Sequence, residues 1–157
     1  MFITDFRKTD FNGLSQLPPN MPPQWGSMTL QHMVEHLIYT FKICNGGMTV
    51  AVYTSADKIQ RIKDISLFSE REFPRDVKMP ILPEHPAPYE YISMQEAIKT
   101  LQAEIEKFEQ HFEEHKGLTN NHPLFGPLVY DEWVRYHNKH FTHHLKQFDL
   151  LQYGYSS

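Results

Sequence analysis

The chain has 157 residues, enough for one domain with its own core and short for two. Hydrophobic residues make up 40% of the chain and aromatic residues 13%, which excludes an intrinsically disordered protein. The formal net charge of -4, without a basic cluster, argues against nucleic acid or an anionic membrane as a partner.

Signals for export and membrane insertion are missing from the sequence. The first residues lack the apolar core of a signal peptide, and no apolar run approaches the ~20 residues that span a bilayer. The single cysteine, Cys44, excludes an intrachain disulfide and is more typical of a small buried hydrophobic residue than of a ligand. We therefore expect a cytoplasmic protein that does not enter membranes.

Proline and glycine divide the first half of the chain into predicted elements. The N-terminal arm, residues 1–24, contains four prolines and has room for at most one short helix. A first helix is predicted over about 27–46, ending at Gly46-Gly47, and a second over about 54–69. The proline-rich stretch 74–88 is predicted to be a long irregular loop, either a lid or a surface connection.

The second half contains two longer predicted helices. Ser93-Met-Gln-Glu96 is a capping box that opens a helix over about 93–116, and Gly117 closes it. Another loop, marked by His122-Pro123 and Gly126-Pro127, precedes a helix over about 130–148. No alternating strand pattern stands out.

The helix predicted over 93–116 carries the clearest packing signal. Residues along one side recur alternately every four and three positions: Met94, Ile98, Leu101, Ile105, Phe108, Phe112 and His115. Such a heptad seam favours neighbouring helices that run nearly parallel or antiparallel to it. The sequence therefore predicts an all-α four-helix bundle, a single domain over residues 1–157.

The helix predicted over 130–148 directs several of the ten histidines inward. One sector of about 100° collects aromatic residues and three histidines: Trp133, His137, His140, Phe141, His144 and Phe148. Each buried imidazole has a donor and an acceptor to satisfy, and three together are hard to satisfy with protein groups alone. A metal ion would take one nitrogen from each of several rings. We expect His143 to lie on the rim.

The spacing of histidines on two helices favours a three-ligand site. His140 and His144 are four residues apart, so both can bind one ion from the same helix face. A third ligand has to come from elsewhere, and His36 lies on a mostly apolar side of the first helix, with His32 nearer its edge. The remaining pair, His111 and His115, is interpreted as a solvated helix face.

Several metal chemistries are excluded by the sequence. It contains no His-Glu-x-x-His, so a zincin-type protease is excluded, and no Glu-x-x-His, which excludes a carboxylate di-iron bundle. One cysteine cannot form a thiolate zinc cluster. A mononuclear site with histidine ligands remains.

Three motifs resemble the DinB/YfiT-like superfamily. Trp25-Gly-Ser-Met28 followed by Met33-x-x-His36 is similar to its first-helix signature, and His137-x-x-His140-x-x-His143-His144-x-x-Gln147 to its last-helix motif. The segment between these motifs, His122-Pro-Leu-Phe-Gly-Pro-Leu-x-Tyr-x-Glu-Trp133, resembles one uncharacterised branch of the superfamily. This chain has Leu145-Lys146 where many members have Arg-Gly.

The resemblance implies a four-helix bundle with a divalent ion held by His36, His140 and His144. It also implies homodimers. Characterised members are thiol-dependent S-transferases or glutathione- or mycothiol-type isomerases, so it implies a small-molecule substrate and a low-molecular-weight thiol. Imidazole ligands suit several ions. We expect zinc or nickel, with iron and manganese as alternatives.

Three neutral imidazoles leave a coordination position open, as in catalytic metal sites. The sequence therefore predicts a metal-dependent enzyme that transfers a thiol to a small molecule or hydrolyses it. His137, one turn before His140, would be catalytic as a proton shuttle, or else a core histidine bonded to a backbone carbonyl. Glu35 and Asn138 are candidates for orienting ligand rings. The alternatives are a non-catalytic metal- or ligand-binding bundle and a metal-free interaction protein.

Overall fold

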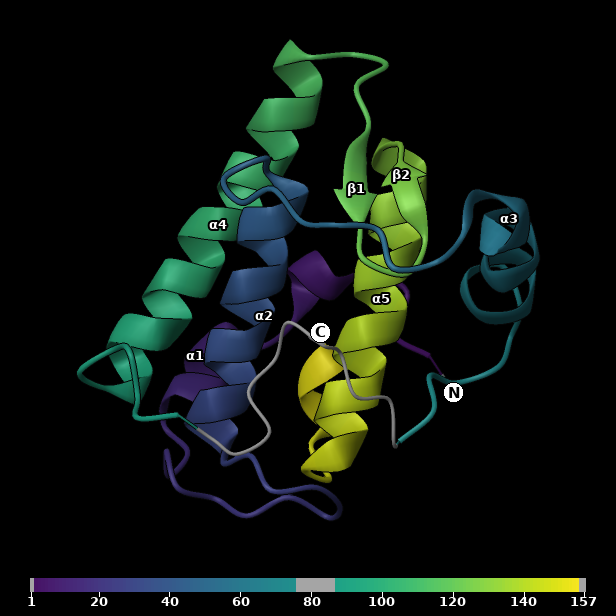
Figure 1. Ribbon diagram of the computed structural model, residues 1–157. Helices are drawn as coiled ribbons and strands as arrows, with labels where there is room; N and C mark the ends of the chain where they lie inside the picture. The colour runs from purple at the N-terminus through teal and green to yellow at the C-terminus, as the bar shows by residue number, and fades with distance from the viewer. Residues whose placement is uncertain (1, 76–86, 156–157) are drawn as a thin grey trace.

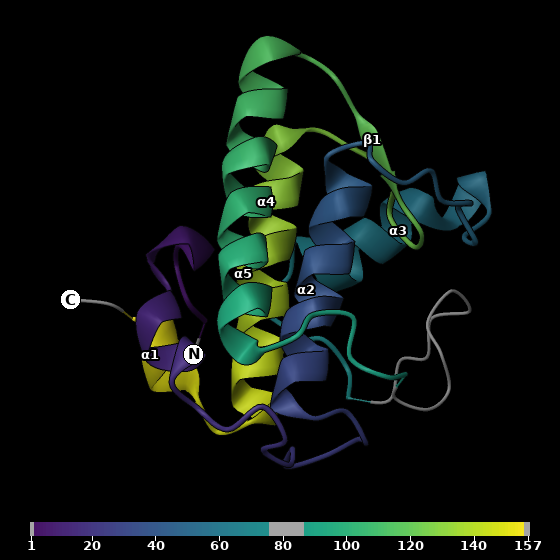
Figure 2. The ribbon, with the colours of Figure 1, turned by 90° about the vertical axis from the view of Figure 1, so that its left-hand side faces the viewer.

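The computed structural model describes residues 2–75 and 87–155. Within these residues the chain is mostly helical, as predicted, with five α-helices and one two-stranded sheet. Three helices are long: α2 (Leu30–Cys44), α4 (Met94–Glu114) and α5 (Tyr130–Gln147). Figure 1 and Figure 2 show these three helices side by side, with α5 running opposite to the other two. A short helix, α1 (Phe11–Ser15), lies in the N-terminal arm.

The ends of the long helices follow the capping signals of the sequence. Thr29 opens α2, because its hydroxyl accepts a hydrogen bond from the backbone N–H of His32 while His32 Nδ1 accepts one from the Thr29 N–H. Gly46, at φ +76, follows the end of α2 in a conformation that glycine adopts without strain. Ser93 caps α4 by accepting from the N–H of Glu96. Each long helix lies within its predicted range, and its ends differ from the predicted ones by at most three residues.

The segment predicted as a helix over 54–69 is broken into short pieces. A 3₁₀ turn (Ala56–Lys58), the four-residue α3 (Ile59–Ile62) and a π-helical turn (Lys63–Leu67) follow one another. Arg135 and Lys139 of α5 donate hydrogen bonds to the carbonyl groups of Leu67 and Ser66. Because these carbonyls accept hydrogen bonds from side chains of α5, the segment ends in an irregular turn instead of continuing as a regular helix.

Two short strands were not predicted. β1 (Asn120–His122) and β2 (Gly126–Leu128) form an antiparallel pair in which His122 lies opposite Gly126. Three residues are too few for an alternating pattern to be recognised in a sequence. Gly126, at φ +68, lies at the close of this hairpin, beside Ile59.

The core lies between the three long helices and is rich in aromatic rings. The predicted seam of α4 is buried at its six apolar positions: Met94, Ile98, Leu101, Ile105, Phe108 and Phe112. Its seventh position, His115, is exposed, because the helix ends at Glu114. Phe6, from the N-terminal arm, packs against Phe41 of α2 and Phe141 of α5. The inward sector predicted for α5 is buried as well, which brings its histidines into the interior.

None of the helices in the described ranges is long and apolar enough to cross a membrane. Most of the proline-rich stretch 74–88, predicted to be either a lid or a surface connection, lies outside the described residues.

Candidate metal centre

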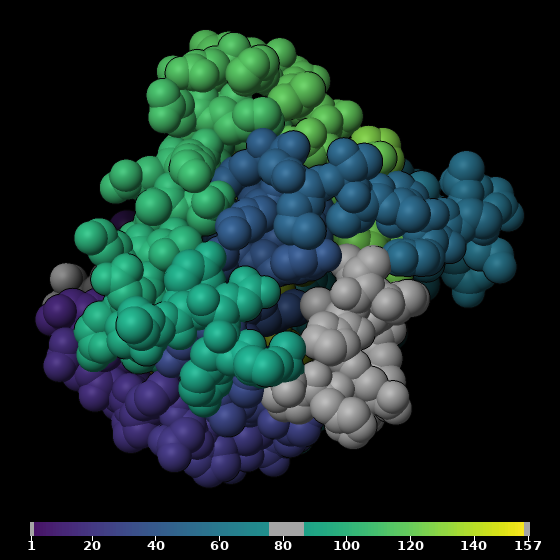
Figure 3. Space-filling view, turned by 60° about the vertical axis from the view of Figure 1, so that its left-hand side comes forward, coloured from purple at the N-terminus to yellow at the C-terminus, as the bar shows by residue number. Residues whose placement is uncertain are grey.

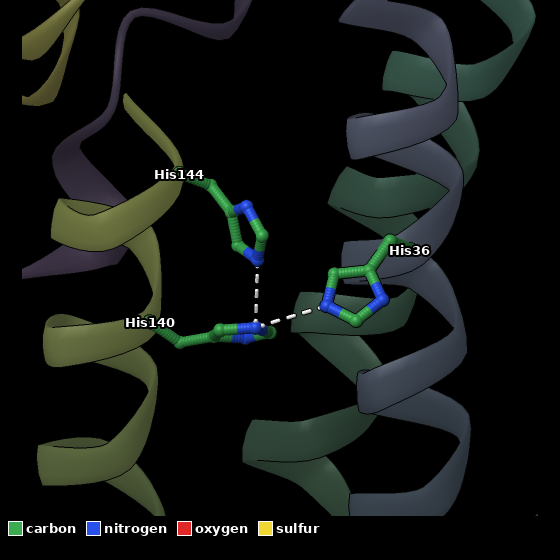
Figure 4. A group of neighbouring side chains, drawn as sticks. All are labelled: His36, His140 and His144. Carbon is green, nitrogen blue, oxygen red and sulfur yellow. Dashed lines mark hydrogen bonds between the residues drawn. The ribbon is translucent and has the colours of Figure 1, made fainter. Parts of the chain in front are cut away.

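Three histidines from two helices converge at one point. Figure 4 shows His140 and His144 extending from α5 toward His36 of α2. The Nε2 atom of His140 lies 3.0 Å from Nε2 of His36 and 3.0 Å from Nε2 of His144. Ligand atoms on a tetrahedral zinc ion are about 3.3 Å apart, given zinc–nitrogen bonds of about 2.0–2.1 Å. Two of the three distances are therefore close to those around one ion, and all three ligand atoms lie within 4.8 Å of one another, which makes this the only such group within the described residues.

Gln147 fixes the protonation of His144. Its amide nitrogen donates to the Trp25 carbonyl at 3.0 Å, so its oxygen faces His144 Nδ1 at 2.8 Å. An amide oxygen only accepts, so Nδ1 of His144 carries the proton. Nε2 of His144 consequently presents a lone pair to the centre of the triad.

Hydrogen bonds among the three rings cannot satisfy all of them. A neutral His140 has one proton, which Nε2 can donate to only one of its two neighbours. Its buried Nδ1 has no hydrogen-bond partner among the described residues. A cation would accept the lone pairs of all three Nε2 atoms at once, so the donor set fits a divalent ion.

Burial keeps the triad in the neutral form that metal ligation needs. It lowers the pKa of His36 to about 4, with a smaller contribution from the charge of His143. Burial also lowers the pKa values of His140 and His144 well below their ordinary range, and the neighbouring histidines add to that effect. Few protons therefore compete with an ion for these nitrogens at neutral pH.

A cavity of about 730 Å³ adjoins the triad, and all three histidines line it. Its volume lies within the range typical of small-molecule sites. Figure 3 shows the hollowed face, with α2 in blue above it and the segment that leads into α4 in teal. Aromatic side chains form much of its wall: Trp25, Tyr39, Phe73, Phe125, Trp133 and Tyr136. An ion at the triad would therefore have one side open to a chamber rather than to protein.

His137 lies in the aromatic core and not on the cavity wall. Its ring stacks on Phe41 with 3.9 Å between centroids and also faces Trp133. It is 0% exposed, and neither ring nitrogen has a hydrogen-bond partner among the described residues. The structure thus supplies neither the proton path of a shuttle nor the backbone carbonyl of the core alternative, and the catalytic role stays a prediction.

Other candidate residues have structural partners. His32 caps α2 and its Nε2 contacts the Ala87 carbonyl, and Glu35 accepts from the backbone N–H groups of Glu90 and Tyr91. Asn138 accepts from the N–H of Phe6, so neither Glu35 nor Asn138 orients a triad ring.

The predictions that His143 lies on the rim and that Cys44 is a small buried residue agree with the structure. His143 lies beside Trp25 and outside the triad, and Cys44 is fully buried. The residue that does orient a ring, Gln147, was not given that role from the sequence. Its position three residues after His144, on the same helix face, was the available signal.

A family model described as "Protein of unknown function (DUF1569)" matches residues 68–150, which is more than half of the chain. The matched part contains α4, the hairpin and α5, and it leaves out α2 with His36. No curated protein and no solved structure matches the chain significantly.

Proposed function

The chain belongs to the DUF1569 family of proteins of unknown function, and from its own geometry we propose that it is a metal-dependent enzyme. His36, His140 and His144 would hold one divalent ion, and a small molecule would react in the adjoining cavity. The observation that carries this proposal is the convergence of three Nε2 atoms, because the rings cannot pair all of these nitrogens with one another and a cation would accept all three lone pairs.

The open side of the triad favours catalysis over a structural role. Structural zinc sites are closed by four protein ligands, whereas catalytic sites keep a position for water or substrate. Here the described residues offer three ligands, and the cavity adjoins them. When bound, such an ion would lower the pKa of a water or thiol ligand, so the reaction is hydrolysis or thiol transfer.

The surrounding residues would prepare the site. Gln147 holds His144 with its lone pair inward, and the buried triad stays neutral. Burial raises the pKa of Tyr136, next to His140, so its hydroxyl stays protonated at neutral pH. The resemblance of the histidine motifs to the DinB/YfiT-like superfamily supports thiol transfer.

The metal content of the purified protein tests the ligand assignment. Protein purified without a nickel column is expected to carry about one divalent ion per chain by elemental analysis. The variant His140→Ala should lose that ion. The matched variant His143→Ala, which removes a histidine of the same helix from outside the triad, should keep it. Equal metal content in both variants would disprove the assignment.

A second measurement separates catalysis from a structural metal. With cobalt in the site, the visible spectrum should change when a small thiol is added, because the open position accepts a new ligand. A spectrum that no thiol or anion alters, together with unfolding on chelation, would instead indicate a closed structural site.

A further inference from the structure

His122 presents a fixed hydrogen-bond donor in the hairpin between α4 and α5. Its Nδ1 accepts from the backbone N–H of Leu124 at 3.0 Å and of Phe125 at 3.3 Å. An imidazole nitrogen that accepts hydrogen bonds carries no proton, so the ring's single proton is on Nε2. Burial lowers the pKa of His122 to about 3, which keeps the ring neutral. The hairpin thus sets both the tautomer and the orientation of His122.

The His122 ring lines the same cavity as the triad. The residue is 4% exposed, and its ring contacts Tyr136 with 4.5 Å between centroids. The Tyr136 ring in turn lies 5.0 Å from that of His140. One aromatic ring therefore separates His122 from the triad, a separation that a small ligand in the cavity can span.

The cavity wall contains groups that can hold the acidic group of a ligand. The Glu35 carboxylate already accepts from the N–H groups of Glu90 and Tyr91. The guanidinium of Arg75 lies 4.1 Å from the centroid of the Trp25 ring and, within the described residues, forms no ion pair. The wall thus offers a ligand the neutral donor of His122, the cation of Arg75 and, once an ion is bound, the open side of the triad, and these three groups attract an anion. The carboxylates of Glu35 and Glu90 on the same wall would repel an anion, so an acidic group has to lie at these three groups, while the aromatic wall suits an apolar body.

We propose that His122 positions the acidic group of a small organic acid with an apolar body, by donating a hydrogen bond from Nε2. This proposal deepens the proposed function and rests on it for the identity of the site. His122 acts here as a positioning residue, and no proton transfer is assigned to it.

Two substitutions separate this role from a purely structural one. In His122→Asn, the side-chain oxygen takes the place of Nδ1 and can accept the same backbone N–H groups, but nothing replaces Nε2. In His122→Gln, the amide nitrogen reaches toward the place of Nε2, while the acceptor for the hairpin is lost. His122→Asn should therefore keep the hairpin and lose the hydrogen-bond donor to the ligand. His122→Gln should keep a donor and destabilise the hairpin.

The assay is calorimetric titration with mandelate, an aromatic organic acid, and with its uncharged methyl ester. We expect the metal-loaded protein to bind mandelate and to discriminate against the ester. His122→Asn should weaken mandelate binding about tenfold to a hundredfold, as expected for a hydrogen bond to a charged group, with melting temperature and metal content unchanged. His122→Gln should melt earlier and still bind mandelate more tightly than His122→Asn.

The outcomes distinguish failure of this proposal from failure of the metal proposal. Wild-type protein that holds its ion but does not bind mandelate would overturn the acid-binding role, as would full affinity in His122→Asn. Protein that carries no ion, yet binds mandelate with a loss in His122→Asn, would overturn the metal site and support the acid site.

Discussion

Replacing Gln147 should weaken metal binding without touching a ligand. The side chain is 4% exposed and connects His144 Nδ1, which it holds in place, to the Trp25 carbonyl. Loss of a partner that orients a ligating histidine lowers metal affinity by about 10- to 100-fold, or about 1.4–2.7 kcal/mol. Gln147→Ala should therefore still bind one ion, but with a dissociation constant higher by that factor.

The second contact of Gln147 adds a separate effect on stability. In Gln147→Ala a buried N–H and a carbonyl lose their partner, which costs about 1–3 kcal/mol of unfolding free energy. Gln147→Glu is the matched control, because its carboxylate can still accept from His144 but cannot donate to Trp25. It should keep or raise the metal affinity, while losing part of the stability.

Competition between the protein and a chromophoric chelator for zinc measures the affinity, and urea unfolding of the metal-free protein measures the stability. Equal zinc affinities in wild type, Gln147→Ala and Gln147→Glu would refute the reasoning, because Gln147 would then serve only to hold the chain near Trp25.

Three other predictions follow from buried groups. Gly26→Ala should lower both stability and zinc affinity, because Gly26 has φ +80 and an added Cβ would lie 3.1 Å from Gln147 Nε2; chelator competition and melting curves report both. His137→Phe should retain the ion and unfold at the same or a higher urea concentration, since it removes two buried nitrogens without partners among the described residues; loss of the ion would contradict this. Metal-free protein should lose stability on acidification, because several buried histidines have lowered pKa values in the folded chain. With the pKa of His122 lowered to about 3, this residue alone binds one more proton in the unfolded chain below pH ~6.5, which costs about 1.4 kcal/mol per pH unit. His122→Asn should have a correspondingly smaller dependence in urea unfolding between pH 7 and pH 5, and an unchanged one would show that His122 titrates normally.

Periodicity predicted the long helices because each has one continuous apolar face. The seam of α4, from Met94 to Phe112, specifies its buried side at every turn, and Ser93 marks its start by local chemistry. The segment over 54–69 carries no comparable face, and its conformation depends on Arg135 and Lys139 of a distant helix. Interactions between elements far apart in the chain are not visible in a local pattern.

The site, too, was predictable where local patterns specify it and not where contacts between distant elements do. His140 and His144 could be placed together because they share a helix face, and His36 because its side of α2 is apolar. Whether an ion binds them stays a prediction. The role of Gln147 required knowledge that the Trp25 carbonyl lies next to it. His122 was noted as the start of a loop and of a motif but was given no role, since its orientation depends on the folded hairpin.

His36 and His140 are 104 residues apart in the chain, and α4 with the hairpin lies in between. An ion shared by them would act as a reversible cross-link that closes a long loop. Cross-links of that span restrict the unfolded chain far more than short ones do. The cell's supply of the ion would then help to set how much of this protein is folded, and so how long it survives proteolysis.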